Sequence, residues 1–291
     1  RHWALSDQVQ SISLFLVSSY LGNPASVFGH SMLKLNTDAT DDRAGMFDLT
    51  VNYGALIPEN EPVIQYIANG ILGGYQAGFS DRYFYTQDLV YSRTEFRDIW
   101  DYRLNLSEKQ RTLLLLHLWE ILGKKFTYYF FDKNCAYRVA ELLELVLEQP
   151  LLTHADLWYA PVETFHRLEE LDQEYQEQGR AGLLSSIRFI PSEQRRLYHY
   201  FNLLALEEQE TVRLLIQDGP DALSTNLQTL ENQASQSRVL DALLAYYQYR
   251  LIAEQPDPSP ASKAGKMKTL LARLRLPPRQ APPEAVPPIA S

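Results

Sequence analysis

The amino-acid sequence predicts an α+β protein, in which an antiparallel sheet packs on helices and further helices follow toward the C-terminus. Three observations predict this class. Short runs that alternate apolar and polar residues fill the N-terminal third, as is typical of strands. Residues 136–147 carry apolar side chains at three- and four-residue spacings, which indicates a one-sided helix. Beyond Pro150 the pattern becomes mostly helical.

The composition excludes several classes of function. The chain has 291 residues and a formal net charge of −9, which argues against nucleic acid as a partner because phosphate binding requires a basic face. Its 45% hydrophobic and 22% charged residues are ordinary for a globular protein. The longest apolar run, residues 12–17, has the length of a strand and falls well short of the ~18 residues of a membrane helix.

Three strands are expected in the first part of the chain. They cover residues 12–18, 30–35 and 46–53. Gly29 comes directly before the second strand and permits an unusual backbone angle there. His30 opens this strand.

If the second and third strands form a hairpin, a plausible register places Leu35 opposite Phe47, and therefore His30 opposite Asn52. An Asn amide beside an imidazole fixes the tautomer and the orientation of the ring. Asn52 is therefore the predicted partner of His30. Asp48 lies on the same face of the strand and is the reserve candidate.

The remaining elements suggest three parts of the chain. Residues 70–91, rich in glycine and aromatic residues, predict strands with glycine breaks, and a capping-box pattern at residues 107–110 precedes a helix to about Ile121. Residues 192–217 and about 225–254 predict two long amphipathic helices. We expect a catalytic domain over residues 1–190, a helical extension over 191–255, and a proline-rich basic linker over 256–291.

The linker prediction rests on composition. Nine of the sixteen prolines lie in the last 36 residues, and residues 263–276 carry five basic residues and no acidic one. A solvated linker is the favoured interpretation of this basic segment. The alternative is a helix that contacts a membrane surface or a partner.

Cys135 is the single cysteine of the chain, and it follows an aromatic run at the start of a predicted helix. Asp132 and Asn134 are residue types that cap helix starts, which puts Cys135 in or beside the first turn. Unpaired backbone N–H groups and the helix dipole stabilise a thiolate there. The simpler alternative is a small buried side chain that only packs.

A thiol at a helix start and a histidine at the mouth of a separate strand form the arrangement of papain-like enzymes. In this arrangement Cys135 is the nucleophile, His30 the base and Asn52 the orienting group. The order of histidine before cysteine corresponds to a circular permutation. Additional candidates for contacts with the substrate or the oxyanion are Ser31, Asp48, Tyr53, Tyr129 and Asn134. No pair of histidines has the spacing of a helical metal site, so no metal and no cofactor are expected.

Four segments carry a resemblance to a known family. Residues 25–31, 51–55, 92–102 and 129–135 resemble the Lnb N-terminal periplasmic domain family of Gram-negative bacteria. The pair Asn134–Cys135 after an upstream histidine is also similar to permuted NlpC-type and lecithin:retinol acyltransferase-like papain relatives.

The resemblance implies a circularly permuted papain-like (NlpC-type) core and a periplasmic, cysteine-dependent enzyme. In the named branch it implies transfer of an acyl chain from a lipid to the amino terminus of a lipoprotein. Cys135, His30 and Asn52 match the positions of the nucleophile, the base and the orienting residue.

Three hypotheses of function remain open. The leading one is a cysteine acyl-transfer enzyme whose substrate is an acyl lipid or a lipoprotein, either a lipoprotein N-acyltransferase or a phospholipid acyl hydrolase. The second is a cysteine peptidase or amidase that acts on cell-wall peptides. The third is a non-catalytic envelope-binding module with residues 66–91 as its contact surface. Peripheral membrane contact through residues 263–276, or through regions outside this chain, is a further expectation.

Overall fold

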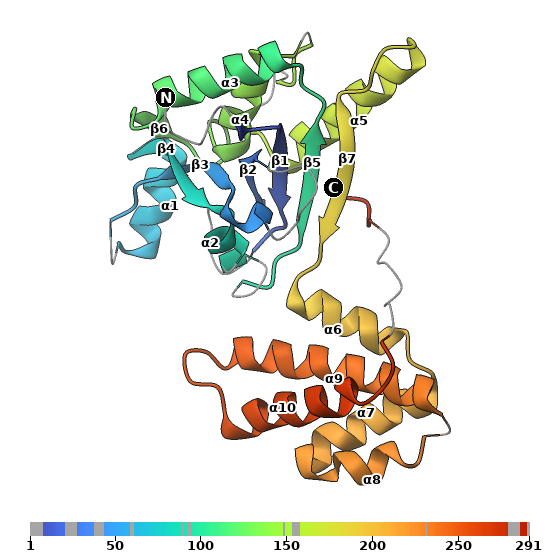
Figure 1. Cartoon of the computed structure of the whole chain (residues 1–291). Coiled ribbons are helices and arrows are strands. Elements are labelled where there is room, and N and C mark those ends of the chain that lie inside the picture. The colour runs from blue at the N-terminus through green and yellow to red at the C-terminus, as the bar shows by residue number, and fades with distance from the viewer. Residues whose placement is uncertain are drawn as a thin grey trace. The chain divides into compact units, whose positions relative to one another are not determined.

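The computed structural model (Figure 1) describes residues 8–20, 28–37, 44–58, 61–88, 90–91, 95–147, 149–152, 158–230, 232–278 and 286–289. The chain divides into two compact units. The first comprises Arg1–Tyr91, Arg97–Ile190 and Val286–Ser291, and we call it the sheet unit. The second comprises Ser92–Phe96 and Pro191–Ala285, and we call it the helical unit.

The sheet unit is built on an antiparallel sheet that has seven strands within the described residues. Their order across the sheet is β6-β4-β3-β2-β1-β5-β7. The strands are β1 (Ser11–Val17), β2 (His30–Asn36), β3 (Leu49–Ala55), β4 (Tyr75–Tyr83), β5 (Ile99–Leu104), β6 (Phe126–Tyr128) and β7 (Leu184–Ile190). This sheet and the helices around it confirm the α+β prediction.

Five helices belong to the sheet unit in the part of the chain that the structure describes. They are α1 (Val63–Leu72), α2 (Phe84–Asp88), α3 (Glu108–Ile121), α4 (Cys135–Glu144) and α5 (Pro161–Glu177). The helix predicted after residues 107–110 is α3, and the Ser107 side chain and Gln110 form its capping box as expected.

The central strands are buried on both faces. Leu33 of β2 packs into the main core together with residues of α4 and α5. Its neighbour Met32 points to the opposite face and packs against Phe84 of α2. Successive side chains of a strand point to opposite faces, so helices on both sides leave β1 and β2 almost without exposed side chains.

The predicted register of the β2–β3 hairpin is wrong by two residues. Leu35 faces Leu49 rather than Phe47, and Met32 rather than His30 faces Asn52. The cause is the 3-10 helix Ala44–Phe47, which removes Phe47 from the strand and leaves it 72% exposed. A shift of two residues keeps the alternation intact, so His30 and Asn52 still lie on the same face.

Residues 70–91 were predicted to form strands, but only part of this segment does. Gly70 lies within helix α1, and residues 84–88 form helix α2. Only residues 75–83, which form β4, are extended over a long stretch. Gly73 has φ 77° and ends α1 in the left-handed conformation that glycine favours.

The helical unit contains α6 (Glu193–Asn202), α7 (Leu206–Asp218), α8 (Leu223–Leu227), α9 (Gln233–Ala253) and α10 (Pro260–Leu274), in the range that the structure describes. The first predicted long helix is broken between α6 and α7. The favoured linker interpretation of residues 263–276 is wrong, since most of them lie in α10. Ser259 caps this helix, and Gly265 lets it approach the ring of Tyr247 in α9 closely.

We predict that Gly70→Ala destabilises the sheet unit. A Cβ at Gly70 would lie 2.2 Å from the buried ring of Phe130, and the Phe130 N–H donates to the Gly70 carbonyl at 2.8 Å. Alanine is the better helix former by about 1 kcal/mol, but overpacking of a buried ring costs about 1–3 kcal/mol. Urea unfolding followed by tryptophan fluorescence measures the effect, because Trp100, Trp119 and Trp158 lie in the described part of the sheet unit.

Gly54→Ala is the matched control. A Cβ at Gly54 meets no atom within 4 Å, so we expect the free energy of unfolding to change little. Equal stability of the Gly70→Ala and Gly54→Ala variants would contradict the tight contact between α1 and Phe130.

Candidate functional site

Cys135 is the first residue of α4, as the capping residues predicted. Asn134 is the N-cap residue, and its Oδ1 accepts hydrogen bonds from the backbone N–H groups of Ala136 at 3.0 Å and Tyr137 at 3.2 Å. The thiol therefore lies in the first turn, where the helix dipole favours negative charge.

The same Asn134 side chain also holds the segments that flank the helix start. Its Nδ2 donates to the carbonyl oxygen of Tyr159 at 2.6 Å and to that of Phe130 at 3.3 Å. Asn134 is 5% exposed, so these groups are shielded from water. Its predicted contact with a substrate is not apparent, because both ends of the amide are engaged by the protein.

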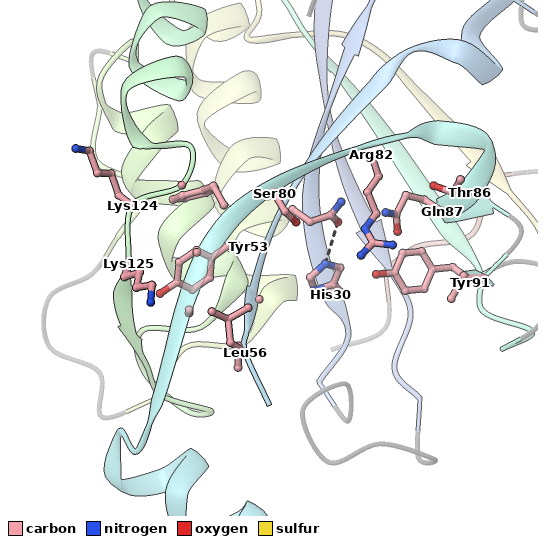
Figure 2. Close-up of a pocket in the computed structure, with 18 residues that line it drawn as sticks. His30, Tyr53, Leu56, Ser80, Arg82, Thr86, Gln87, Tyr91, Lys124 and Lys125 are labelled. Carbon is pink, nitrogen blue, oxygen red and sulfur yellow. Dashed lines mark hydrogen bonds between the residues drawn. The ribbon is translucent and has the colours of Figure 1, made fainter. Parts of the chain in front are cut away.

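His30 and Asn52 meet across the strands β2 and β3. The Nε2 atom of His30 and the Oδ1 atom of Asn52 are 3.3 Å apart (Figure 2). Since Nε2 faces Asn52, Nδ1 is the ring nitrogen left for the thiol. His30 and Asn52 therefore do pair, although they meet diagonally across the two strands and not directly opposite each other as the predicted register had it.

Cys135 and His30 shift each other's pKa. Burial alone would raise the pKa of the Cys135 thiol, but the positive charge of His30 and a hydrogen bond to its imidazole lower that pKa below its ordinary value. Burial alone would lower the pKa of His30, but the charge of Cys135 and the same hydrogen bond raise it. Both shifts favour an imidazolium–thiolate pair.

Two backbone N–H groups also contribute to the lowered pKa of the Cys135 thiol. They belong to Ser31 and Ala136. The Ser31 hydroxyl is fully buried and has no hydrogen-bond partner among the described residues. Ser31 therefore contributes to the site through its main chain.

Two residues near the site were missed by the sequence prediction. Tyr128 is 5% exposed, and its hydroxyl accepts a hydrogen bond from the backbone N–H of Cys135. Arg97 is 1% exposed, donates from Nε to the Ser18 carbonyl at 2.6 Å, and places a positive charge near His30 that lowers the pKa of the imidazole. Arg97 lies in a motif that carries the family resemblance, and Tyr128 directly precedes another, but only the fold brings them to the dyad.

Other predicted site residues are engaged elsewhere. Asp48 forms a buried ion pair with Lys34 at 3.0 Å and accepts hydrogen bonds from Thr37, so it is not the partner of His30. Tyr129 packs its ring over Gly73, where any Cβ would collide with it. Neither residue is brought to the sulfur.

A groove of about 630 Å³ opens on one side of the dyad (Figure 2). His30, Asn52 and Tyr53 line it, whereas Cys135 does not and is only 3% exposed. Reagents in the groove therefore meet the imidazole before the sulfur. The groove is lined by His30, Asn52, Tyr53, Gly54, Ala55, Leu56, Ala77, Gly78, Phe79, Ser80, Arg82, Thr86, Gln87, Val90, Tyr91, Gly123, Lys124 and Lys125.

The described residues contain no group of three or more His, Cys, Asp or Glu side chains that would hold a metal ion. Within the same ranges, every helix is too short or too polar to cross a membrane.

Comparison with known proteins identifies the family. The model of the Lnb N-terminal periplasmic domain matches residues 1–170. This chain belongs to the Lnb N-terminal periplasmic domain family. Cys135, His30 and Asn52 all lie inside the matched part of this Lnb domain, and the family description assigns it to the periplasm. Neither the curated proteins nor the solved structures gave a match.

We predict that Cys135 is alkylated by iodoacetamide at a pH where an ordinary thiol is protonated. Above its lowered pKa the thiolate forms, so alkylation is expected to persist at a pH about one unit below the ~8.5 of a free cysteine. His30→Ala removes the cation and leaves the effect of burial, which raises the thiol pKa. The rate at that pH should then fall at least about tenfold, which corresponds to one pKa unit.

Mass spectrometry of Cys135 at a series of pH values measures these rates. His117→Ala, which removes a histidine from the exposed side of α3, serves as the control and should leave the rate unchanged. Equal rates for wild type and His30→Ala would contradict the coupling of the two groups.

A second prediction concerns Asn134. Asp caps a helix as well as Asn at an ordinary site, but Asn134→Asp also replaces two buried N–H donors with carboxylate oxygen. We expect it to lower the free energy of unfolding by about 2 kcal/mol or more, because buried carbonyl oxygens lose their partner. Tryptophan fluorescence in urea measures the loss.

Asn232→Asp, at the exposed N-cap of α9, tests the ordinary case. We expect it to leave the free energy of unfolding nearly unchanged, as measured by far-UV circular dichroism. A similarly neutral Asn134→Asp would show that the contacts with Phe130 and Tyr159 contribute little.

Proposed function

We propose that this chain is a cysteine-nucleophile acyl-transfer enzyme of the periplasm, built on a circularly permuted papain-like core. The single observation that carries the proposal is the mutual pKa shift of Cys135 and His30, with Asn52 3.3 Å from the other ring nitrogen. A buried sulfur that only packs needs no cationic partner, no backbone donors and no oriented imidazole.

The proposed reaction begins with transfer of the Cys135 proton to Nδ1 of His30. The thiolate attacks the carbonyl carbon of an acyl ester, and the dipole at the start of α4 favours the negative charge of the tetrahedral oxyanion. The C–O bond then breaks, and His30 returns the proton to the departing alkoxide. An acyl thioester on Cys135 remains.

The second half of the reaction consumes the thioester. An amine or a water molecule attacks its carbonyl carbon while His30 accepts the proton of the attacking group. The C–S bond breaks and the thiolate is regenerated. With the amino terminus of a lipoprotein as acceptor the enzyme is an N-acyltransferase, and with water it is an acyl hydrolase. A cysteine peptidase or amidase acting on cell-wall peptides would use the same groups on an amide bond.

Within this mechanism Asn52 and Arg97 both act on the histidine. Asn52 orients the ring and raises the pKa of His30, whereas the buried charge of Arg97 lowers that pKa. Their opposing effects keep the imidazole able both to accept and to return a proton.

One observation favours a second candidate, a non-catalytic envelope-binding module. Cys135 is 3% exposed and lies behind His30 rather than in the lining of the groove. In that case residues 66–91 would provide the contact surface, and ligand binding would survive replacement of the cysteine.

The test is incubation with short-chain diacyl phospholipids followed by intact-mass analysis. We expect one acyl group added to wild type, none to Cys135→Ala or His30→Ala, a reduced yield for Asn52→Ala, and full yield for the control His117→Ala. Peptide mapping assigns the adduct to Cys135.

Cleavage of cell-wall peptides without acyl turnover would favour the peptidase instead. Failure of both reactions, with ligand binding retained by Cys135→Ala, would favour the non-catalytic module.

A further inference from the structure

The groove beside His30 follows the strand pair β3–β4. Asn52, Gly54, Ser80 and Gly78 point to the same face, and Gly54 lies directly opposite Gly78. Neither glycine has a side chain to fill the space, so the pair forms the floor of the groove. A Cβ at Gly54 would meet nothing within 4 Å.

The two ends of the groove differ. Figure 2 shows Arg82, Thr86, Gln87 and Tyr91 at the end near His30. Lys124 and Lys125 lie at the other end, beyond Tyr53, and Leu56 lies between Tyr53 and His30. Leu56, directly after the end of β3, follows Asn52 by four residues, which corresponds to about 13 Å of extended chain.

The lining of the groove is cationic in a chain whose net charge is −9. It contains Arg82, Lys124 and Lys125 besides His30, and no Asp or Glu among the described residues. None of these three cations forms an ion pair with another described residue. Such a groove attracts anions and disfavours cationic ligands.

A buried donor also points to a ligand. The Oδ1 atom of Asn52 faces His30, but its Nδ2 atom is buried and has no hydrogen-bond partner among the described residues. Asn52 is 8% exposed and lines the groove. A buried amide N–H without an acceptor costs about 1–3 kcal/mol, and an oxygen of a ligand in the groove would remove that cost.

Apolar side chains are exposed from Leu56 onward. Leu56 and Ile57 are 62% and 39% exposed, and the uncharged helix α1 exposes Val63, Ile64 and Leu72 by 67%, 85% and 79%. Exposed aliphatic side chains of this kind mark contact with an apolar partner. A cationic groove whose lining includes one of them, Leu56, fits an anionic amphiphile better than a polar peptide.

We propose that this groove binds the phosphate-bearing polar part of an anionic acyl lipid, with Arg82, Lys124 and Lys125 as its cationic contacts. The assignment deepens the proposed function and rests on it for the reacting ester. The ester carbonyl lies at the His30 end, Asn52 Nδ2 donates to a ligand oxygen, and α1 with Leu56 and Ile57 faces the apolar phase from which the lipid comes.

The test is binding to the full-length Cys135→Ala variant, which cannot form a thioester. Calorimetric titration compares three dihexanoyl lipids below their micelle concentration: phosphatidylglycerol, the zwitterionic phosphatidylcholine, and the uncharged diacylglycerol. We expect phosphatidylglycerol to bind at least about tenfold more tightly than diacylglycerol, with phosphatidylcholine between them, and the preference to shrink as salt is raised. We expect glycerol 3-phosphate and inorganic phosphate, each titrated alone, to bind more weakly than phosphatidylglycerol because they lack its acyl chains.

Charge-removing variants locate the site. Arg82→Gln and the double variant Lys124→Gln/Lys125→Gln should each weaken phosphatidylglycerol binding about three- to fivefold and leave diacylglycerol binding unchanged. Lys109→Gln is the matched control, because Lys109 is an exposed lysine of the sheet unit at the far end of α3, about 20 Å of helix away from Lys124. It should bind like the parent.

Gly54→Leu fills the floor of the groove. Its side chain enters open space, so the fold should persist by tryptophan fluorescence while lipid binding is lost. Gly54→Ala, with a single added methyl group, should reduce binding only slightly.

The proposal is overturned if the three lipids bind equally, if neither charge-removing variant discriminates between charged and uncharged lipid, or if a carboxylate-bearing cell-wall peptide binds more tightly than phosphatidylglycerol. Lipid binding without acylation of Cys135 in the wild-type chain would reject the proposed function and retain the groove assignment. Equal acylation of Cys135 by charged and uncharged lipids would reject the groove assignment and retain the proposed function.

Discussion

The side chain of Asn134 is the constraint on which the arrangement of the site depends. It satisfies two backbone N–H groups at the start of α4 and two carbonyl oxygens from flanking segments, all away from water. A single buried amide thus fixes where the helix begins, and with it the position of Cys135 relative to β2. An amide is needed for this role, because a hydroxyl has one donor and a carboxylate has none, whereas the amide provides two N–H donors and an acceptor oxygen.

Burial of the dyad has two opposing consequences. Removing a thiol and an imidazole from water disfavours the charged form of each group, yet each provides the counter-charge that the other lacks. Each group therefore favours the charged form of the other. The N–H groups of Ser31 and Ala136 add fixed dipoles that do not depend on solvent. Arg97 brings a third charge of fixed sign, which limits how strongly His30 holds its proton.

The groove and the sulfur of Cys135 lie on different sides of the sheet. Cys135 is packed with the main core, whereas Asn52 and the glycine pair face the opposite side of the sheet. His30, at the beginning of β2, is the residue that reaches both. This explains why the histidine lines the groove and the cysteine does not. It also gives the imidazole a position between an anion-binding surface and the sulfur.

Local patterns predicted much of the sheet unit. The buried strand β1, the capping box of α3 and the placement of Cys135 in the first turn of α4 were confirmed, because each depends on residues close together in the chain. The failures share one cause, which is packing between distant residues. The 3-10 helix Ala44–Phe47 shifted the register of β2 and β3. The segment expected to be a basic linker is instead helix α10, whose Gly265 packs closely on Tyr247.

The sequence by itself determined the identity of the family, the α+β class and the candidate residues Cys135, His30 and Asn52, since these rest on residue types, short spacings and motif order. Only the tertiary structure decided that the imidazole and the sulfur act on each other, that Asp48 is taken by Lys34, and that Arg97 and Tyr128 stand beside the dyad. The physical reason is that charge and hydrogen-bond coupling fall off within a few ångströms. Which residues lie within that range is set by strand pairing and helix packing.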